Sequence, residues 1–163
     1  MQIRISPVLK GLITAAVMIT VFLVIYTTNK DSGSSLQFLV YGIYGAGIIW
    51  TLLAYRNSAA FTGKFGDLFS QGFKCFVVVT LCIAIFYGVF NYMHPEFVEE
   101  TAARYREQLL QEKNKLPTEI DSAIATFKKQ YSLKLVSGAI FGYLIIGAGV
   151  TAVVSALLTR RKT

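Results

Sequence analysis

Four long apolar stretches limit what this chain can fold into more than any other feature. Residues 11–26, 36–55, 75–93 and 135–158 contain no Asp, Glu, Lys, Arg or His. A helix needs about 20 apolar residues to cross the roughly 30 Å hydrocarbon core of a bilayer. The first stretch reaches that length when its apolar flanks are included. The sequence therefore predicts an all-α membrane protein with four transmembrane helices.

The spans occupy about half of the 163 residues, which leaves little chain for a separate domain. We predict one integral membrane domain over residues 1–163. Its spans are expected over residues 8–28, 36–55, 73–93 and 135–158.

The distribution of charge predicts the topology. The segments before the first span, between the second and third spans, and after the fourth carry the whole net charge of +7. The remaining segments are balanced. An excess of Lys and Arg marks the cytoplasmic side of a membrane. We therefore expect a multi-pass protein of an inner (cytoplasmic) membrane, with both termini in the cytoplasm.

We do not expect nucleic acid as a partner, although the net charge is positive. No soluble surface combines a basic stripe with interleaved aromatic residues. Basic flanks beside membrane spans instead face anionic lipid headgroups. The expected partners are the lipid bilayer and either another membrane protein or further copies of this chain.

The segment at residues 94–131 is the only sizeable part outside the predicted spans, and it has two helical patterns. Pro95 and the acids after it suit a helix start. A second helix is expected after the Leu116–Pro117 break, with Thr118 as its cap and Asp121 three residues later. We expect an extracytoplasmic helical hairpin between spans three and four, closed on its apolar stripes or continuing the two spans.

The cytoplasmic segment at residues 56–74 has phenylalanines at helical spacing, with polar residues on the opposite arc. The pattern predicts an amphipathic helix at the membrane surface, or a bent lead-in to span three. Its function would be a lipid or partner contact, or simply connection. The membrane-facing residues would be Phe61, Phe65, Phe69 and Phe73.

Small residues recur along span four at a spacing that indicates helix packing. Without Cβ bulk, two helices approach closely, and lipid supplies no hydrophobic drive between them. The predicted contact face consists of Gly138, Gly142, Ala148 and Ala152. It would face another span of this chain or a partner.

Few residues of this chain have side chains of the kinds that catalysis or metal binding requires. His94 with Glu96, Glu99 and Glu100 lacks the paired His or Cys spacing of a zinc site, so a polar helix start is the simpler interpretation. The two cysteines lie on one predicted helix, too far apart for a disulfide. Deep tyrosines need hydroxyl partners within the bundle. We predict no catalytic, cofactor-binding or metal-binding residue, and no enzyme.

Several short motifs resemble a small four-span bacterial inner-membrane family known as domain of unknown function 4199. They are Phe65-Gly66-Asp67-Leu68-Phe69, Gly72-Phe73-Lys74, Pro95-Glu96-Phe97-x-Glu99 and Arg160-Arg161-Lys162. The resemblance implies an inner-membrane protein without an assigned activity, and it supplies no catalytic residue.

Two functions fit these features. The first is a non-catalytic accessory or scaffold subunit that binds another membrane component. The alternative is a small carrier or channel for a lipid or hydrophobic molecule. A carrier of ions is disfavoured. Such proteins generally keep an ionisable group or a broken helix at mid-membrane, and no Asp, Glu, His, Lys or Arg lies at the middle of a predicted span here.

Overall fold

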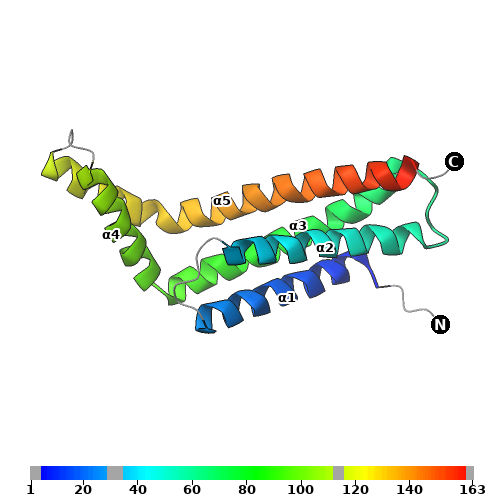
Figure 1. The fold of residues 1–163 in the computed structure, drawn as a ribbon, viewed down its shortest axis with the longest axis horizontal. Helices are drawn as coiled ribbons and strands as arrows, with labels where there is room; N and C mark the ends of the chain where they lie inside the picture. Colours follow the sequence, from blue (N-terminus) through cyan, green and yellow to red (C-terminus); the bar gives the residue numbers. More distant parts are fainter. Residues whose placement is uncertain (1–4, 29–34, 112–115, 161–163) are drawn as a thin grey trace. The chain divides into compact units, whose positions relative to one another are not determined.

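The computed structural model describes residues 5–28, 35–111 and 116–160, and within them all regular structure is helical (Figure 1). This confirms the all-α prediction. The five helices are α1 (Pro7–Thr28), α2 (Ser35–Arg56), α3 (Phe65–Met93), α4 (Glu96–Gln111) and α5 (Pro117–Arg160).

Four of these helices are long and apolar enough to cross a membrane: α1, α2, α3 and α5. The shortest two have 22 residues each, and at 1.5 Å per residue they are about 33 Å long. The prediction of four membrane-spanning helices is therefore confirmed at the level of length and composition. Helix α5 has 44 residues, about 66 Å, so only part of it can lie within a bilayer.

The chain divides into two compact units, a feature that the predicted single domain did not include. Residues 1–83 and 140–163 form the first unit, here called the bundle, and residues 84–139 form the second, here called the arm. Helices α3 and α5 each pass from one unit into the other.

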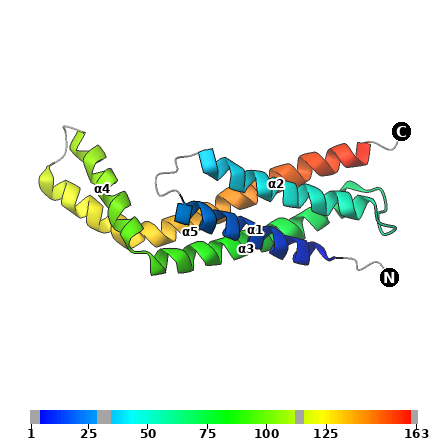
Figure 2. The same cartoon turned by 60° about the horizontal axis from the view of Figure 1, so that its bottom comes forward.

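In the bundle, α1 and α2 lie side by side and run in opposite directions (Figures 1 and 2). The core between the helices is filled by buried side chains such as Met18, Tyr44, Ile48 and Leu52. Large apolar side chains also cover the outside of the helices. A surface in contact with water rarely exposes so many apolar side chains, whereas a surface in contact with lipid does. Examples are Leu12, Val17, Val24, Ile49, Ile145, Val153 and Leu157.

The arm is held by an apolar seam between α4 and the first part of α5. Its buried members are Ala102 and Leu109 from α4 and Ile120 and Ile124 from α5. The aromatic rings of Tyr105 and Phe127 pack against this seam, with ring centroids 5.0 Å apart. The predicted closure of the two helices on their apolar stripes is thus seen, and the second helix is also continuous with span four.

Prolines mark the starts of the two arm helices. Helix α4 begins directly after His94–Pro95, where α3 has ended at Met93. Helix α5 begins at Pro117, and the carboxylate of Glu119 accepts a hydrogen bond from the Leu116 N–H at 3.1 Å. The predicted cap at Thr118 with Asp121 was wrong, because the proline already occupies the first helical position.

The segment between α2 and α3 is not a separate amphipathic helix. Residues 57–64 are non-helical and include Gly63 with φ of 85°, a value that suits glycine. Helix α3 then begins at Phe65 and runs without a break to Met93. Of the two predicted forms, the structure has the lead-in to span three.

The seam makes a testable difference between adjacent positions of α5. An aspartate in place of Ile124, which is 8 % exposed, would bury an unpaired charge, so Ile124→Asp should destabilise the arm by about 2–3 kcal/mol. Ala125 is exposed, and Ala125→Asp should have almost no effect. Limited proteolysis of the purified full-length protein measures both. Equal cleavage rates for the two variants would contradict the seam.

Candidate functional site

The buried face of α5 in the bundle lies beside the predicted small-residue face and not on it. Tyr143, Gly147, Thr151 and Ser155 are buried at a spacing of four residues. A Cβ atom added at Gly138 or Gly142 would meet no atom of the described chain within 4 Å. Ala148 and Ala152 are half-buried. Whether this predicted face contacts a partner stays a prediction.

Gly147 is a point of close approach between α5 and its neighbours. A Cβ atom added there would lie 2.7 Å from Cγ of Phe76 and closer still to the hydroxyl of Tyr44. The Tyr44 hydroxyl crosses this gap and donates a hydrogen bond to the backbone carbonyl of Tyr143 at 2.8 Å. The two tyrosine rings meet edge to face with centroids 5.1 Å apart. Glycine is required here so that a tyrosine from α2 can reach the backbone of α5.

Glycines allow the same close approach between other pairs of helices in the bundle. A Cβ added at Gly11 of α1 would lie 2.8 Å from the carbonyl oxygen of Cys75 in α3. One added at Gly47 of α2 would overlap Thr14 of α1, and one at Gly72 of α3 would overlap Thr151 of α5. The sequence showed glycines in the spans, but it could not show which of them face a neighbour.

Polar side chains inside the bundle mostly bond within their own helix. The Thr14 hydroxyl donates to the carbonyl of Lys10, and the Thr80 hydroxyl to that of Phe76. The Thr51 hydroxyl also lies 3.3 Å from the sulfur of Cys75, which joins α2 to α3. Both cysteines are free, as expected from their spacing.

The four predicted membrane-surface phenylalanines are spread over the connector and the start of α3. Phe65 and Phe73 are exposed, whereas Phe61 and Phe69 are half-buried. Phe61 packs edge to face against Tyr55, and Phe65 stacks on Phe69 with centroids 5.7 Å apart. Their contact with a membrane surface stays a prediction.

A pocket of about 390 Å³ opens at the end of the bundle where α1 begins, α2 ends and α3 begins. It is lined by side chains from all three helices and from the connector, including Ser6, Lys10, Trp50, Tyr55 and Gln71. This pocket was not among the features predicted from the sequence. Its one available signal was a lysine at the start of an apolar helix.

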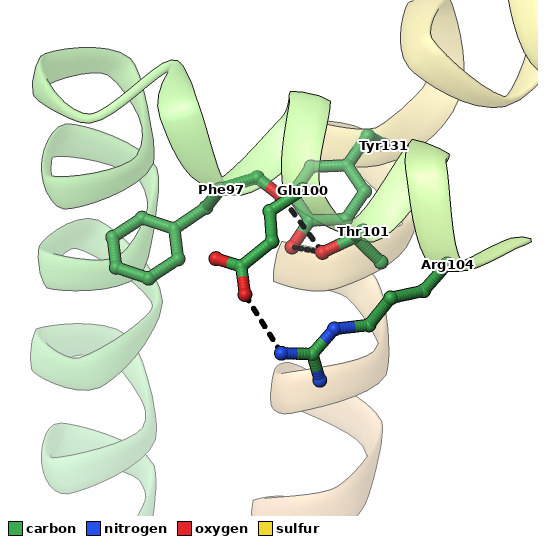
Figure 3. A network of polar contacts seen from close by, with 5 residues as sticks. All are labelled: Phe97, Glu100, Thr101, Arg104 and Tyr131. Atoms are coloured by element: carbon green, nitrogen blue, oxygen red, sulfur yellow. Dashed lines mark hydrogen bonds and ion pairs between the residues drawn. The ribbon is translucent and has the colours of Figure 1, made fainter. Parts of the chain in front are cut away.

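In the arm, polar contacts fix the start of α4 (Figure 3). The Thr101 hydroxyl donates to the carbonyl of Phe97 at 2.7 Å and lies 3.4 Å from the hydroxyl of Tyr131 in α5. On the outer side of α4, Arg104 pairs with Glu100 at 2.7 Å. Charged side chains also join the two helices, with Arg106 bonded to Asp121 and Lys128 to Glu99.

His94 and Glu96 meet at the junction between α3 and α4. The Nδ1 atom of His94 lies 2.6 Å from Oε1 of Glu96. The hydrogen bond to its own backbone N–H, followed by the one to His94, lowers the pKa of the Glu96 carboxyl below its usual value. No group of three or more His, Cys, Asp or Glu side chains that could hold a metal ion occurs among the residues that the structure describes.

These features define the class: a small all-helical protein with four helices long and apolar enough to cross a membrane, and with a charged helical arm. Comparison with known families identifies the group more closely. The model of the family described as "Protein of unknown function (DUF4199)" matches residues 9–161, so the chain belongs to this family. This confirms the resemblance seen in the sequence. No curated protein and no solved structure matches the chain.

The glycine contacts predict different effects at two positions of α5. Gly147→Ala should destabilise the bundle by about 1–3 kcal/mol, because the added methyl group must displace Phe76 and the bonded Tyr44. Gly142→Ala should leave stability unchanged or slightly higher, since the site is open and alanine favours helix. Thermal unfolding in mild detergent compares them. An equal loss at both positions would refute the Gly147 contact.

The Glu96 carboxyl predicts a pH-dependent contribution to stability. A carboxyl with a lowered pKa in the folded protein stabilises it above the unfolded pKa of about 4.3, and the contribution is lost as the pH falls through the folded pKa. Glu96→Gln should therefore lower the thermal midpoint at pH 7, and the difference from wild type should vanish in acid. Glu107→Gln, at an exposed position of the same helix, is the control. A pH-independent difference would contradict this role.

Proposed function

We propose that this protein is a non-catalytic accessory or scaffold subunit of the membrane, and that the arm is its contact surface for another membrane component. The observation that supports this most is the structure of the arm itself. Residues 29–34 are enough to join α1 to α2, whereas the connection between spans three and four contains α4 and the first part of α5. A connector alone does not need two packed helices.

The arm is also built to keep a fixed shape. Four buried side chains close α4 onto α5, and two ion pairs cross between these helices. At the base of the arm, the buried Asn91 side chain of α3 donates to the Ser132 hydroxyl of α5 at 2.6 Å. Exposed ion pairs add little stability each, so their main effect is to fix the helix register and the pattern of surface charge. A fixed charged surface suits recognition of a protein partner.

We place the protein in the bacterial inner membrane, with both termini in the cytoplasm and with α4 and the first part of α5 on the opposite side. The charge asymmetry supports this orientation. The start of α1, the end of α2, the start of α3 and the end of α5 lie at one end of the bundle (Figure 1). The basic residues described in or beside these helix ends are Lys10, Arg56, Lys64, Lys74 and Arg160. The only acid described there is Asp67, whose carboxylate accepts a hydrogen bond from Thr62.

Cysteine labelling of intact spheroplasts tests the orientation. In a background with both native cysteines replaced by serine, a membrane-impermeant maleimide should label Lys129→Cys in the arm. Thr163→Cys should be labelled only after the membrane is permeabilised. Labelling of Thr163→Cys in sealed spheroplasts, with Lys129→Cys protected, would reverse the proposed topology.

Co-purification in mild detergent tests the function. Wild type and Ala125→Asp should retain a protein partner at a fixed stoichiometry, because both keep the arm folded. Ile124→Asp should lose that partner while the bundle remains in the membrane, since its substitution lies in the arm alone. The bound lipids are identified in the same samples. A specific lipid without any stoichiometric protein, unaffected by Ile124→Asp, would favour the carrier function instead.

A further inference from the structure

The pocket at the end of the bundle has the chemistry of an anion site. Its lining includes one lysine and several hydrogen-bonding side chains, but no aspartate or glutamate. Lys10 is the charged member. Its side chain comes from the first turns of α1, and its Nζ lies 5.5 Å from the ring centroid of Trp50 in α2.

Lys10 is unusual because it is buried and has no counter-ion in the described chain. It is 8 % exposed, although lysine is almost never fully buried unless it is paired. None of the ion pairs found among the described residues includes it. The Trp50 ring face offers partial compensation, as aromatic rings attract cations. A buried ammonium that faces a pocket is best balanced by a negative charge inside that pocket.

Two further donors line the same space. The Ser6 oxygen accepts a hydrogen bond from the Leu9 N–H, which leaves its own hydroxyl hydrogen for another acceptor. Gln71 contributes a side-chain amide from α3. By contrast, the hydroxyls of Tyr55 and Ser58 already donate to backbone carbonyls. The donors still available therefore include the Lys10 ammonium, the Ser6 hydroxyl and the Gln71 amide, a set that suits the several acceptor oxygens of a phosphate group.

We propose that this pocket binds a phosphate group, and that in the membrane this is the headgroup phosphate of an anionic phospholipid, with Lys10 as its counter-ion. The lipid source rests on the orientation proposed above, which puts the pocket on the cytoplasmic side, where basic pockets between spans receive lipid headgroups. The size supports it too. A volume of about 390 Å³ is an order of magnitude above the roughly 30 Å³ of a water molecule, so the glycerol part of a lipid fits beside the phosphate. Ile5, Pro7 and Ala54 supply apolar lining for it.

This site belongs to the bundle and does not depend on the arm. The proposed scaffold function could fail while the phosphate site remains, and the reverse also holds. The variants that test the arm leave all pocket residues unchanged, so the two proposals are tested separately.

The test measures thermal stability and lipid binding of the purified full-length protein in detergent. Three probes are added in turn: phosphatidylglycerol, diacylglycerol with the same acyl chains, and inorganic phosphate. We expect phosphatidylglycerol to raise the thermal midpoint and to remain bound in native mass spectrometry. Diacylglycerol lacks the phosphate and should do neither. Stabilisation by inorganic phosphate to the same extent would keep the phosphate site but assign it to a soluble ligand.

Two variants separate the pocket from general charge effects. Lys10→Met should weaken phosphatidylglycerol binding about tenfold, the loss expected for one charge-assisted contact. Without lipid it should be at least as heat-stable as wild type, because it removes an unpaired buried cation, and this shows that the fold is intact. Lys74→Met removes an exposed cation of α3 near the same end and should bind like wild type. Equal lipid binding by Lys10→Met and wild type, or equal stabilisation by diacylglycerol, would overturn the proposal.

Discussion

The bundle depends on the contact at which the Tyr44 hydroxyl passes over Gly147 to the carbonyl of Tyr143. Inside a bilayer, lipid tails are as apolar as the side chains, so burying leucine between helices gains little free energy. Helices must instead gain van der Waals contact and hydrogen bonds, and both require backbones to approach closely. Glycines at four positions, Gly11, Gly47, Gly72 and Gly147, provide that approach between different pairs of helices. The outward apolar side chains then face lipid without penalty.

The two helices of the arm are held together by burial of apolar side chains, in contrast to the bundle. Helix α4 and the first part of α5 carry mixed charge, and their buried apolar residues form one seam between the two helices. Burial of that seam is favourable only where water is the solvent, because the hydrophobic effect removes apolar surface from water. One chain therefore contains two kinds of helix packing, each suited to its own medium. Helices α3 and α5 belong to both units, which is why α5 has 44 residues and changes from a charged to an apolar sequence along its length.

The candidate site could be predicted only in part. The seam of the arm was predictable, since Leu109 and Ile124 recur at helical spacing among polar residues, and periodicity on a polar background identifies the buried face. Span four offered no such contrast. Almost every residue there is apolar or small, so the predicted face at Gly138 and Gly142 was as plausible from the sequence as the observed one at Gly147 and Thr151. The pocket was not predictable, because its lining comes from three helices and a connector.

The sequence by itself determined the number of spans, the helical class and the separation of a charged segment from the apolar ones. These properties depend on the local composition of the chain, because the apolar content of each segment decides whether that segment can cross a bilayer. It also indicated the family, which the match over residues 9–161 confirmed. Only the tertiary structure decided which glycines are contacts and that Lys10 is buried beside Trp50. Those outcomes depend on the rotation of each helix about its axis, which is fixed by neighbours that lie far away in sequence.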